Sequence, residues 1–452
     1  MTLWIDVEDI YAYMHRNSRP SGIQRLCFEL YTALLAVPDL DVRFLHHDSL
    51  LNTLRVVEWT EVANLYQEMT RRIAVSPSPP APDSSHTLGT GSARHLITRL
   101  PPELREALGH TVRSQMIAAR AAMRAVRALP TLWYRPSHAS KRPASTGIDI
   151  MDLAKPGDVL GTFGSPWAHP AYAGMVSRIV QARDMRFALL IYDLIPAIRP
   201  EFCDRGLVDR FLIFLRDCLP AADHILTISR TTADDVTRWA GHEEIALRCA
   251  PKVIPIGNGF ATSPPSALPA GLSPSSYALF VSTIEARKNH MQVFRIWRRM
   301  LEEMPREQVP TLVFAGRVGW MVADLMQAIE NTNWLDGKLV LVREPDDATL
   351  SALYRSCRFT LFPSHYEGWG LPVSESLSFG KVCIASNSTA VPEAGGNLCL
   401  YVDPDNTSGA YEVVRNAIQQ PEVIAELEAR IADSYRPVSW SDTAAALLDA
   451  IT

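Results

Sequence analysis

Residues 358–386 read RFTLFPSHYEGWGLPVSESLSFGKVCIAS, and this order of apolar and glycine-rich segments predicts a strand–loop–helix–strand unit. The apolar runs at 358–362 and 382–386 predict two strands. The segment from Pro372 to Gly380 predicts a short helix, because proline suits the first helical turn and glycine ends a helix. Such a unit joins parallel strands, so its loop lies at the carboxyl edge of the sheet, where ligands bind.

Two glutamates, Glu367 and Glu375, stand eight positions apart in this unit. We predict Glu367 in the loop and Glu375 in the first helical turn, whose exposed N–H groups also favour phosphate. A glutamate in a first turn can serve only to stabilise its helix. The second glutamate and the GWGLP turn between the two favour a ligand site.

Similar apolar runs recur along the whole chain and indicate its fold class. In the first half they begin at residues 3, 42, 158, 187 and 224, and in the second half at residues 278, 311, 338, 358 and 382. Helical patterns lie between them, which predicts doubly wound parallel sheets of the α/β class. Because 452 residues exceed one ordinary domain, we predict two Rossmann-like domains.

A segment rich in Pro, Gly and Ser, residues 252–276, predicts the connection between these domains. A boundary near Gly257 gives an N-terminal domain of residues 1–256 and a C-terminal domain of residues 257–435. Residues 436–452 contain an amphipathic helix, which either caps the second domain or crosses back to the first.

An insertion at about residues 76–145 interrupts the pattern of the N-terminal domain. Residues 76–92 are of low complexity, and residues 94–142 carry ten Lys or Arg against two Glu. A basic amphipathic helix predicted at 102–129 either binds anionic lipid or packs on its own domain. Five of its arginines gather on one side: Arg105, Arg113, Arg120, Arg124 and Arg127.

Composition and charge argue against several classes of protein. The net charge of −5 and the pI near 6.2 argue against a nucleic-acid-binding protein. The seven cysteines form no CxxC pair, which fits reduced thiols. The chain shows neither a signal-peptide pattern nor eighteen consecutive apolar residues. We therefore expect a cytoplasmic protein, with peripheral attachment to the inner membrane as an alternative.

The motifs FVSTIEARKNH (280–290) and PSHYEGWGLPVSESLSFGKVCIAS (363–386) resemble those of the retaining family 4 glycosyltransferases. The likeness extends through IYDLIPAIRPEF, ILTISRTTADDV, FAGRVGW and VPEAGG, and covers most of residues 150–452. It implies the GT-B fold, in which two Rossmann-like domains face a deep cleft. The resemblance further implies that the N-terminal domain (1–256) binds the acceptor and that the C-terminal domain (257–435) binds the nucleotide sugar.

The resemblance also implies an activity. The TIEARKNH variant is most similar to bacterial mannosyl- and rhamnosyltransferases of surface-polysaccharide assembly, including lipopolysaccharide. We expect a retaining hexosyltransferase that moves a sugar, with mannose from GDP-mannose as the first guess, from a nucleotide-diphosphate donor. The expected acceptor is a glycan or a polyprenyl-diphosphate-linked oligosaccharide. A front-face mechanism needs neither a metal nor another cofactor.

Site residues follow from the same resemblance, since fixed cations can stabilise a departing diphosphate. The catalytic candidates are Glu367, Arg287, Lys288, Asp193 and His169. The candidates for substrate binding are Glu375 at the ribose, the backbone of Gly368, Trp369, Gly370 and Leu371 at the diphosphate, Arg317 at the base or diphosphate, and Gly22 in a glycine loop that opens the first helix. The family frequently has a further basic residue where this chain has Ser282 or Thr283.

Other readings of the chain remain as alternatives. A GT-B phosphorylase or epimerase, or a non-catalytic scaffold that binds nucleotide sugar or glycan, would share the fold. An NAD-dependent oxidoreductase is disfavoured, because no G-x-G-x-x-G follows a predicted strand. The acidic DVED at residues 6–9 could suggest Mg²⁺, but a strand end and turn is the simpler interpretation.

Overall fold

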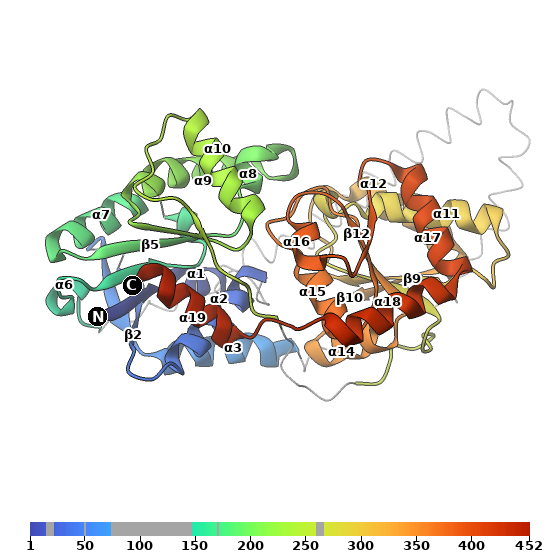
Figure 1. Ribbon diagram of the computed structural model, residues 1–452, viewed down its shortest axis with the longest axis horizontal. Helices are drawn as coiled ribbons and strands as arrows, with labels where there is room; N and C mark the ends of the chain where they lie inside the picture. Colours follow the sequence, from blue (N-terminus) through green and yellow to red (C-terminus); the bar gives the residue numbers. More distant parts are fainter. Residues whose placement is uncertain (15–21, 49–50, 74–146, 170, 259–265) are drawn as a thin grey trace, which may run out of the picture. The chain divides into compact units, whose positions relative to one another are not determined.

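The computed structural model describes residues 1–14, 22–48, 51–73, 147–169, 171–258 and 266–452 (Figure 1). Residues Met1–Ala74 and Ile148–Thr452 form one compact unit. The predicted basic helix at 102–129 therefore lies outside the described residues. Within the described residues, every helix is too short or too polar to span a bilayer.

The first lobe of this unit is built on a seven-stranded sheet with the order β3-β2-β1-β4-β5-β6-β7. All its neighbouring strands pair in parallel except β2 and β3, which are antiparallel. Its strands are β1 (Thr2–Asp6), β2 (Asp41–Asp48), β3 (Thr53–Val57), β4 (Val159–Thr162), β5 (Arg186–Ile191), β6 (His224–Thr227) and β7 (Lys252–Val253). Its helices are α1 (Glu8–Met14), α2 (Gly22–Leu35), α3 (Trp59–Ile73), α6 (Ile150–Leu153), α7 (Tyr172–Arg183), α8 (Ile195–Ile198), α9 (Arg205–Cys218), α10 (Arg230–His242) and α19 (Trp440–Ile451).

The second lobe is built on a six-stranded parallel sheet with the order β10-β9-β8-β11-β12-β13. Its strands are β8 (Tyr277–Val281), β9 (Thr311–Gly316), β10 (Leu339–Arg343), β11 (Phe359–Phe362), β12 (Cys383–Ser386) and β13 (Leu400–Val402). Its helices are α11 (His290–Glu303), α12 (Ala323–Asn331), α13 (Asn333–Gly337), α14 (Asp347–Ser356), α15 (Leu371–Ser378), α16 (Val391–Gly395), α17 (Thr407–Gln419) and α18 (Pro421–Ser434). Two doubly wound α/β sheets are thus confirmed.

Strand β8 shows why the central strands read as continuous apolar runs. Ala278 and Phe280 enter one core cluster of the second lobe, whereas Tyr277 and Leu279 enter a cluster on the opposite face. Side chains alternate between the faces of a strand, and helices cover both faces of a parallel sheet. All four side chains are therefore fully buried.

Helix α15 ends just before Gly380, the glycine predicted to end it. Gly380 adopts a left-handed φ of 70°, its N–H donates to the Leu377 carbonyl, and the Lys381 N–H donates to the Ser376 carbonyl. This Schellman arrangement satisfies carbonyl groups that the helix end would otherwise leave unpaired.

Helix α19 lies against α2, so the end of the chain packs on the first lobe (Figure 1). A capping box at Ser439 and Asp442 starts the helix. Ala444, Leu447 and Ile451 are then fully buried in a core cluster of the first sheet.

Shortening a buried side chain of α19 should lower the stability of the first lobe. We expect Leu447→Ala to lower the free energy of unfolding by about 2–5 kcal/mol, because it removes a fully buried side chain and leaves a cavity. Urea titration followed by circular dichroism measures the loss. Leu35→Ala is the matched control, since Leu35 on α2 is 39% exposed. Equal effects of the two substitutions would contradict the packing of α19.

Candidate active site

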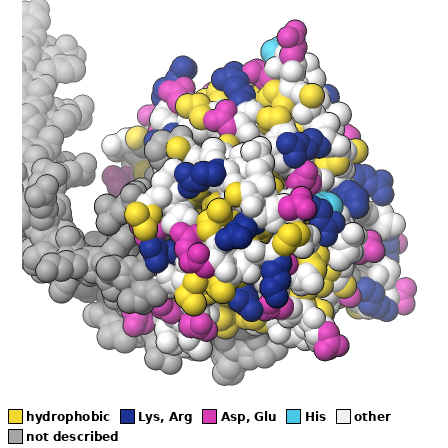
Figure 2. Space-filling view, turned by 90° about the vertical axis from the view of Figure 1, so that its left-hand side faces the viewer, with side chains coloured by type: hydrophobic (Ala, Val, Ile, Leu, Met, Phe, Trp, Pro, Cys, Tyr) yellow, Lys and Arg dark blue, Asp and Glu magenta, His cyan; other side chains and the backbone are white. Residues whose placement is uncertain are grey.

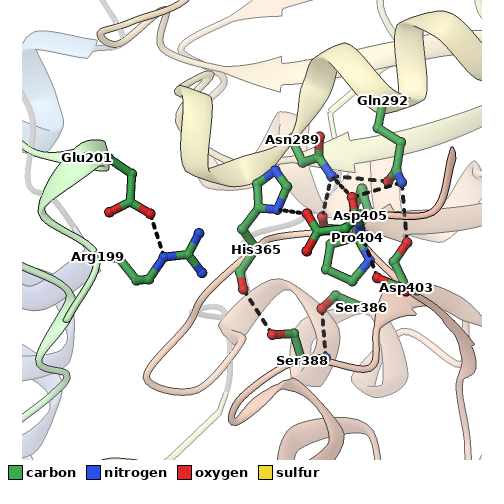
Figure 3. Close-up of polar contacts among 11 residues, drawn as sticks. Arg199, Glu201, Asn289, Gln292, His365, Ser386, Ser388, Asp403, Pro404 and Asp405 are labelled. Carbon is green, nitrogen blue, oxygen red and sulfur yellow. Dashed lines mark hydrogen bonds and ion pairs between the residues drawn. The ribbon is translucent and has the colours of Figure 1, made fainter.

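Arg287 and Lys288 lie in a short 3-10 helix, η4 (Ala286–Lys288), beyond the carboxyl end of β8. The next residue, Asn289, has a left-handed φ of 66°, which asparagine tolerates. Its buried amide donates to the carbonyl oxygens of Pro404 at 2.8 Å and Pro363 at 3.2 Å. Gln292 also donates to the Pro404 carbonyl (Figure 3). These bonds fix the basic pair to two neighbouring loops.

Contacts of the His365 backbone and side chain hold the loop before α15 in place. The His365 N–H donates to the Arg287 carbonyl at 3.0 Å, and its carbonyl accepts from the Ser388 hydroxyl at 2.9 Å. Its ring nitrogen Nδ1 lies 3.1 Å from a carboxylate oxygen of Asp405 (Figure 3). The ring also stacks on Phe202 of the first lobe. The positions of Tyr366 and Glu367 are thereby set.

Glu367 lies between the two basic residues, at the centre of a buried charge cluster. Its Oε1 is 2.6 Å from Lys288 Nζ, and its Oε2 is 2.8 Å from Arg287 Nη1. Arg287 also donates to the Tyr366 carbonyl and pairs with buried Glu285 at 2.7 Å. The side chains of Glu367, Arg287 and Lys288 are each no more than 15% exposed. Each charge is therefore paired, as buried charges must be.

The charge state of Glu367 follows from this environment. Burial opposes its ionisation, but the nearby charges of Arg287 and Lys288 outweigh burial and lower the pKa of Glu367 to about 2. A carboxylate with so low a pKa is a poor general base at neutral pH, where efficient bases have a pKa near the working pH. The geometry thus favours a role for Glu367 in balancing the charges of Arg287 and Lys288 and in positioning these two side chains.

Asp193 reaches the same cluster from the first lobe, where it follows β5. Its carboxylate accepts the Ile195 N–H at 3.0 Å, which fixes the turn. Burial raises the pKa of Asp193 despite the nearby positive charge of Arg287. The adjacent Tyr192 carbonyl packs against Gly368, where an added Cβ would lie 2.1 Å from that oxygen. Only glycine permits this close approach of the two chain segments.

Glu375 is the fifth residue of α15, so its predicted place in the first helical turn was wrong. The helix begins one residue earlier than predicted, at Leu371, with Gly370 as its N-cap. The Tyr354 hydroxyl donates to Glu375 Oε2 at 2.8 Å. Burial raises the pKa of Glu375, although the charge of Arg25 on α2 acts in the opposite direction. Tyr354 of α14 thus orients the Glu375 carboxylate, and the charge of Arg25 on α2 acts on it.

The remaining predicted binding residues lie near the starts of helices or the end of a strand. The Trp369 indole donates to the Ser374 hydroxyl at 3.1 Å. Arg317 follows β9 with an exposed side chain, and its carbonyl accepts from Ile284. Gly22 is the first residue of α2, and an added Cβ there would meet no atom within 4 Å. Packing therefore gives no reason for glycine at this position.

His169 belongs to a different group of side chains. Its ring packs edge-on against His47, with ring centroids 5.0 Å apart, and burial together with His47 lowers its pKa. His47 in turn pairs with buried Asp6 at 2.8 Å, and the Tyr172 hydroxyl donates to Asp6 at 2.6 Å. In the described chain none of the contacts of His169 is with the Glu367 cluster.

The DVED segment is more than a strand end and turn. Asp6 ends β1, and a helix begins at Glu8. Asp9 is buried beside Gly164, where an added Cβ would meet its carboxylate at 2.4 Å. Among the described residues, no group of three His, Cys, Asp or Glu side chains is arranged to hold a metal ion.

Sequence reasoning missed several residues that support the cluster. Glu285 and Asn289 flank the basic pair in the quoted motif, but nothing in their local pattern shows their partners. Glu393, within the VPEAGG motif, accepts the backbone N–H groups of Arg230 at 2.8 Å and Thr231 at 2.9 Å. It thereby caps α10 of the first lobe with a carboxylate, which a helix N-terminus favours.

Comparison with known proteins places this cluster in a family. Residues 272–433 match the family described as "Glycosyl transferases group 1". This part of the chain is a glycosyltransferase group 1 domain. The group 1 domain contains Arg287, Lys288, Arg317, Glu367 and Glu375, whereas Gly22, His169 and Asp193 lie outside it.

Curated relatives of the chain are bacterial sugar transferases. The chain is 27% identical over 252 residues to the O-antigen chain mannosyltransferase B of Escherichia coli, covering 54% of this chain and 64% of that protein. It is 32% identical over 136 residues to the GDP-mannose:cellobiosyl-diphosphopolyprenol alpha-mannosyltransferase of Komagataeibacter xylinus, covering 29% and 35%. The chain therefore spans less than two thirds of the length of these relatives.

Solved structures extend the likeness beyond the group 1 domain. Anabaena HepE in complex with UDP matches with a TM-score of 0.55 at 11% identity, over 99% of both chains. Sucrose-phosphate synthase from Thermosynechococcus elongatus matches with a TM-score of 0.57 at 16% identity, over 99% of this chain and 98% of that one. The predicted GT-B fold is thus confirmed across both lobes.

The low pKa of Glu367 predicts a pH-dependent effect of Glu367→Gln. Because the folded pKa of about 2 lies below the ordinary value, ionised Glu367 stabilises the fold above about pH 4.5. This stabilisation is lost as the pH falls toward 2. We therefore expect the variant to unfold at lower urea concentration than wild type at pH 7, and the difference to shrink at pH 3.

Glu330→Gln, on an exposed part of α12, is the control for this measurement. A difference between wild type and Glu367→Gln that stays constant from pH 7 to pH 3 would contradict the ion pairing of Glu367.

Proposed function

We propose that the chain is a retaining glycosyltransferase that transfers mannose from GDP-mannose during surface-polysaccharide assembly. The observation that carries the proposal is the buried cluster in which Arg287 and Lys288 hold Glu367, eight residues before Glu375, within a group 1 domain. The relatives named as mannosyltransferases support the sugar, and the name of the Komagataeibacter relative supports GDP-mannose and a polyprenyl-diphosphate-linked acceptor.

The basic pair and the start of α15 hold the diphosphate in this proposal. Arg287 and Lys288 lie beyond the carboxyl end of β8, and α15 begins beyond that of β11, its neighbour in the sheet. Both therefore lie at one edge of the sheet, where helix N–H groups and fixed cations favour phosphate oxygens. Before the donor binds, Glu285 and Glu367 balance the two cations. The two cations are thus paired and positioned without the donor.

Transfer proceeds on one face of the donor sugar. The bond between the anomeric carbon and the diphosphate oxygen breaks while the acceptor oxygen attacks from the same side. The acceptor proton passes to the departing phosphate oxygen, and Arg287 and Lys288 stabilise the charge that develops there. Glu367 positions the sugar, and its negative charge stabilises the positive charge that develops on the sugar ring. Glu367 does not take the acceptor proton, because its low pKa makes it a weak base. Glu375 accepts hydrogen bonds from the ribose.

Nucleotide binding tests the donor. We expect GDP to raise the temperature of unfolding more than UDP, dTDP or ADP at equal concentration, since a ligand at 100 times its dissociation constant adds about 2.7 kcal/mol. Guanosine, which lacks the diphosphate, should have little effect. The shift with GDP should be unchanged in EDTA, because protein cations take the place of a metal. A larger shift with another nucleotide, or a shift lost in EDTA and restored by Mg²⁺, would contradict this assignment.

Kinetics of donor turnover separate the roles of the two glutamates. We expect Glu375→Ala to raise the KM for the donor by removing ribose contacts, and Glu367→Ala mainly to lower kcat, because its contacts matter most in the transition state. Lys288→Ala should lower kcat/KM on the order of 10² or more. Lys381→Ala is the matched control, since Lys381 pairs instead with Glu428 of α18. Near-normal kinetics of all three site variants would refute the site.

A further inference from the structure

Arg25 on α2 of the first lobe reaches the second lobe beside Glu375. Its guanidinium donates to both carboxylate oxygens of Asp347 on α14, at 3.4 and 3.5 Å. The negative charges of Glu375 and Asp347 raise the pKa of Arg25, and Glu375 acts the more strongly of the two. Arg25 thus brings a positive charge from the first lobe to the glutamate that we assign to the ribose.

Helix α14 holds the partners of both side chains. Asp347 and Tyr354 are two helical turns apart, so they lie on the same face of the helix. Asp347 accepts from Arg25, while the Tyr354 hydroxyl donates to Glu375 Oε2 at 2.8 Å. The side chain of Asp346 caps the start of the helix. This one helix therefore fixes the arginine and the glutamate relative to each other.

These side chains are still open to a ligand. The side chain of Arg25 is 25% exposed and that of Asp347 is 45% exposed, and Glu375 is only partly buried. An ion pair that is so accessible to water contributes little to stability. The position of the arginine next to Glu375 therefore matters more than the strength of its ion pair.

We propose that Arg25 is a positioning residue that tunes Glu375 for the hydroxyls of the donor ribose; this inference rests on the proposed function. An ionised carboxylate accepts stronger hydrogen bonds than a neutral carboxyl, and a nearby positive charge favours the ionised form. Burial raises the pKa of Glu375, whereas the charge of Arg25 lowers it. Because Arg25 belongs to the first lobe and Glu375 to the second, recognition of the ribose depends on both lobes.

Two other roles fit Arg25 less well. As a ligand of the diphosphate it would place phosphate among the acidic groups that act on it, which include Glu375, Asp347 and Glu29. These charges repel phosphate but tolerate a neutral ribose. As a simple link between the lobes it would be weak, because its ion pair is partly exposed.

Calorimetric titration with GDP and with 2′,3′-dideoxy-GDP, which lacks both ribose hydroxyls, tests the proposal. We expect wild type to bind GDP about tenfold or more tightly than the dideoxy nucleotide, as for hydrogen bonds to a charged group. Arg25→Met should lower this ratio about threefold or more by weakening GDP alone, and Arg25→Lys should restore part of it. Arg216→Met is the matched control, since Arg216 lies on helix α9 of the same lobe and pairs with Glu243 at 2.7 Å.

The pH dependence of this ratio separates tuning of Glu375 from a merely structural role. The charged and titratable groups that act on Glu375 are Arg25, Tyr354 and Asp347. Without Arg25 the pKa of Glu375 is higher, so Glu375 becomes neutral at a higher pH as the solution is acidified. Between pH 9 and pH 5, discrimination against the dideoxy nucleotide should therefore be lost at a higher pH in Arg25→Met than in wild type.

Arg25→Gln, which is also neutral, replaces Arg25→Met if that variant does not fold. A ratio and a pH dependence that neither neutral variant changes would overturn the proposal. An equal loss of affinity for both nucleotides would overturn it in favour of a phosphate ligand or a structural link. If wild type binds both nucleotides equally, the ribose role of Glu375 is wrong and this inference fails with it. Absence of GDP binding by wild type would refute the proposed donor as well.

Discussion

The ionised Glu367 carboxylate, held between Arg287 and Lys288, is the interaction around which the site is arranged. Three charges are removed from water, and this is tolerable only because each has a partner within hydrogen-bond distance. The loops that carry them must therefore be fixed closely. Asn289 and His365 do this through backbone carbonyl and amide groups of neighbouring loops (Figure 3).

The same constraint extends to the first lobe through a small set of contacts. Gly368 packs directly on the Tyr192 carbonyl, and Glu393 caps the N-terminus of α10. Trp320 donates to the carbonyl of Phe202. These contacts place Asp193 where the charge of Arg287 acts on it. The surface differs from this buried cluster in its charge arrangement. On the face shown in Figure 2, Lys and Arg side chains of the described chain are interspersed with Asp and Glu side chains.

The central strands could be predicted from the sequence because they are buried on both faces and read as apolar runs. All ten predicted runs became strands of the two sheets. Three strands at the edges were missed: β3, β7 and β13. Strands β7 and β13 have two and three residues, which is too short for a periodic pattern, and β3 carries Arg55 within its apolar run.

The sequence by itself determined the α/β class, the βαβ unit around Glu367 and the residue types at the edge of the second sheet. These features depend on side-chain alternation, glycine and proline, all of which act over a few neighbouring residues. Only the tertiary structure decided that Glu367 is shared by Arg287 and Lys288, that Asp193 joins them, and that His169 packs with His47 instead. Burial and charge pairing decide these outcomes, and both depend on residues far apart in the chain that only the folded sheets bring together.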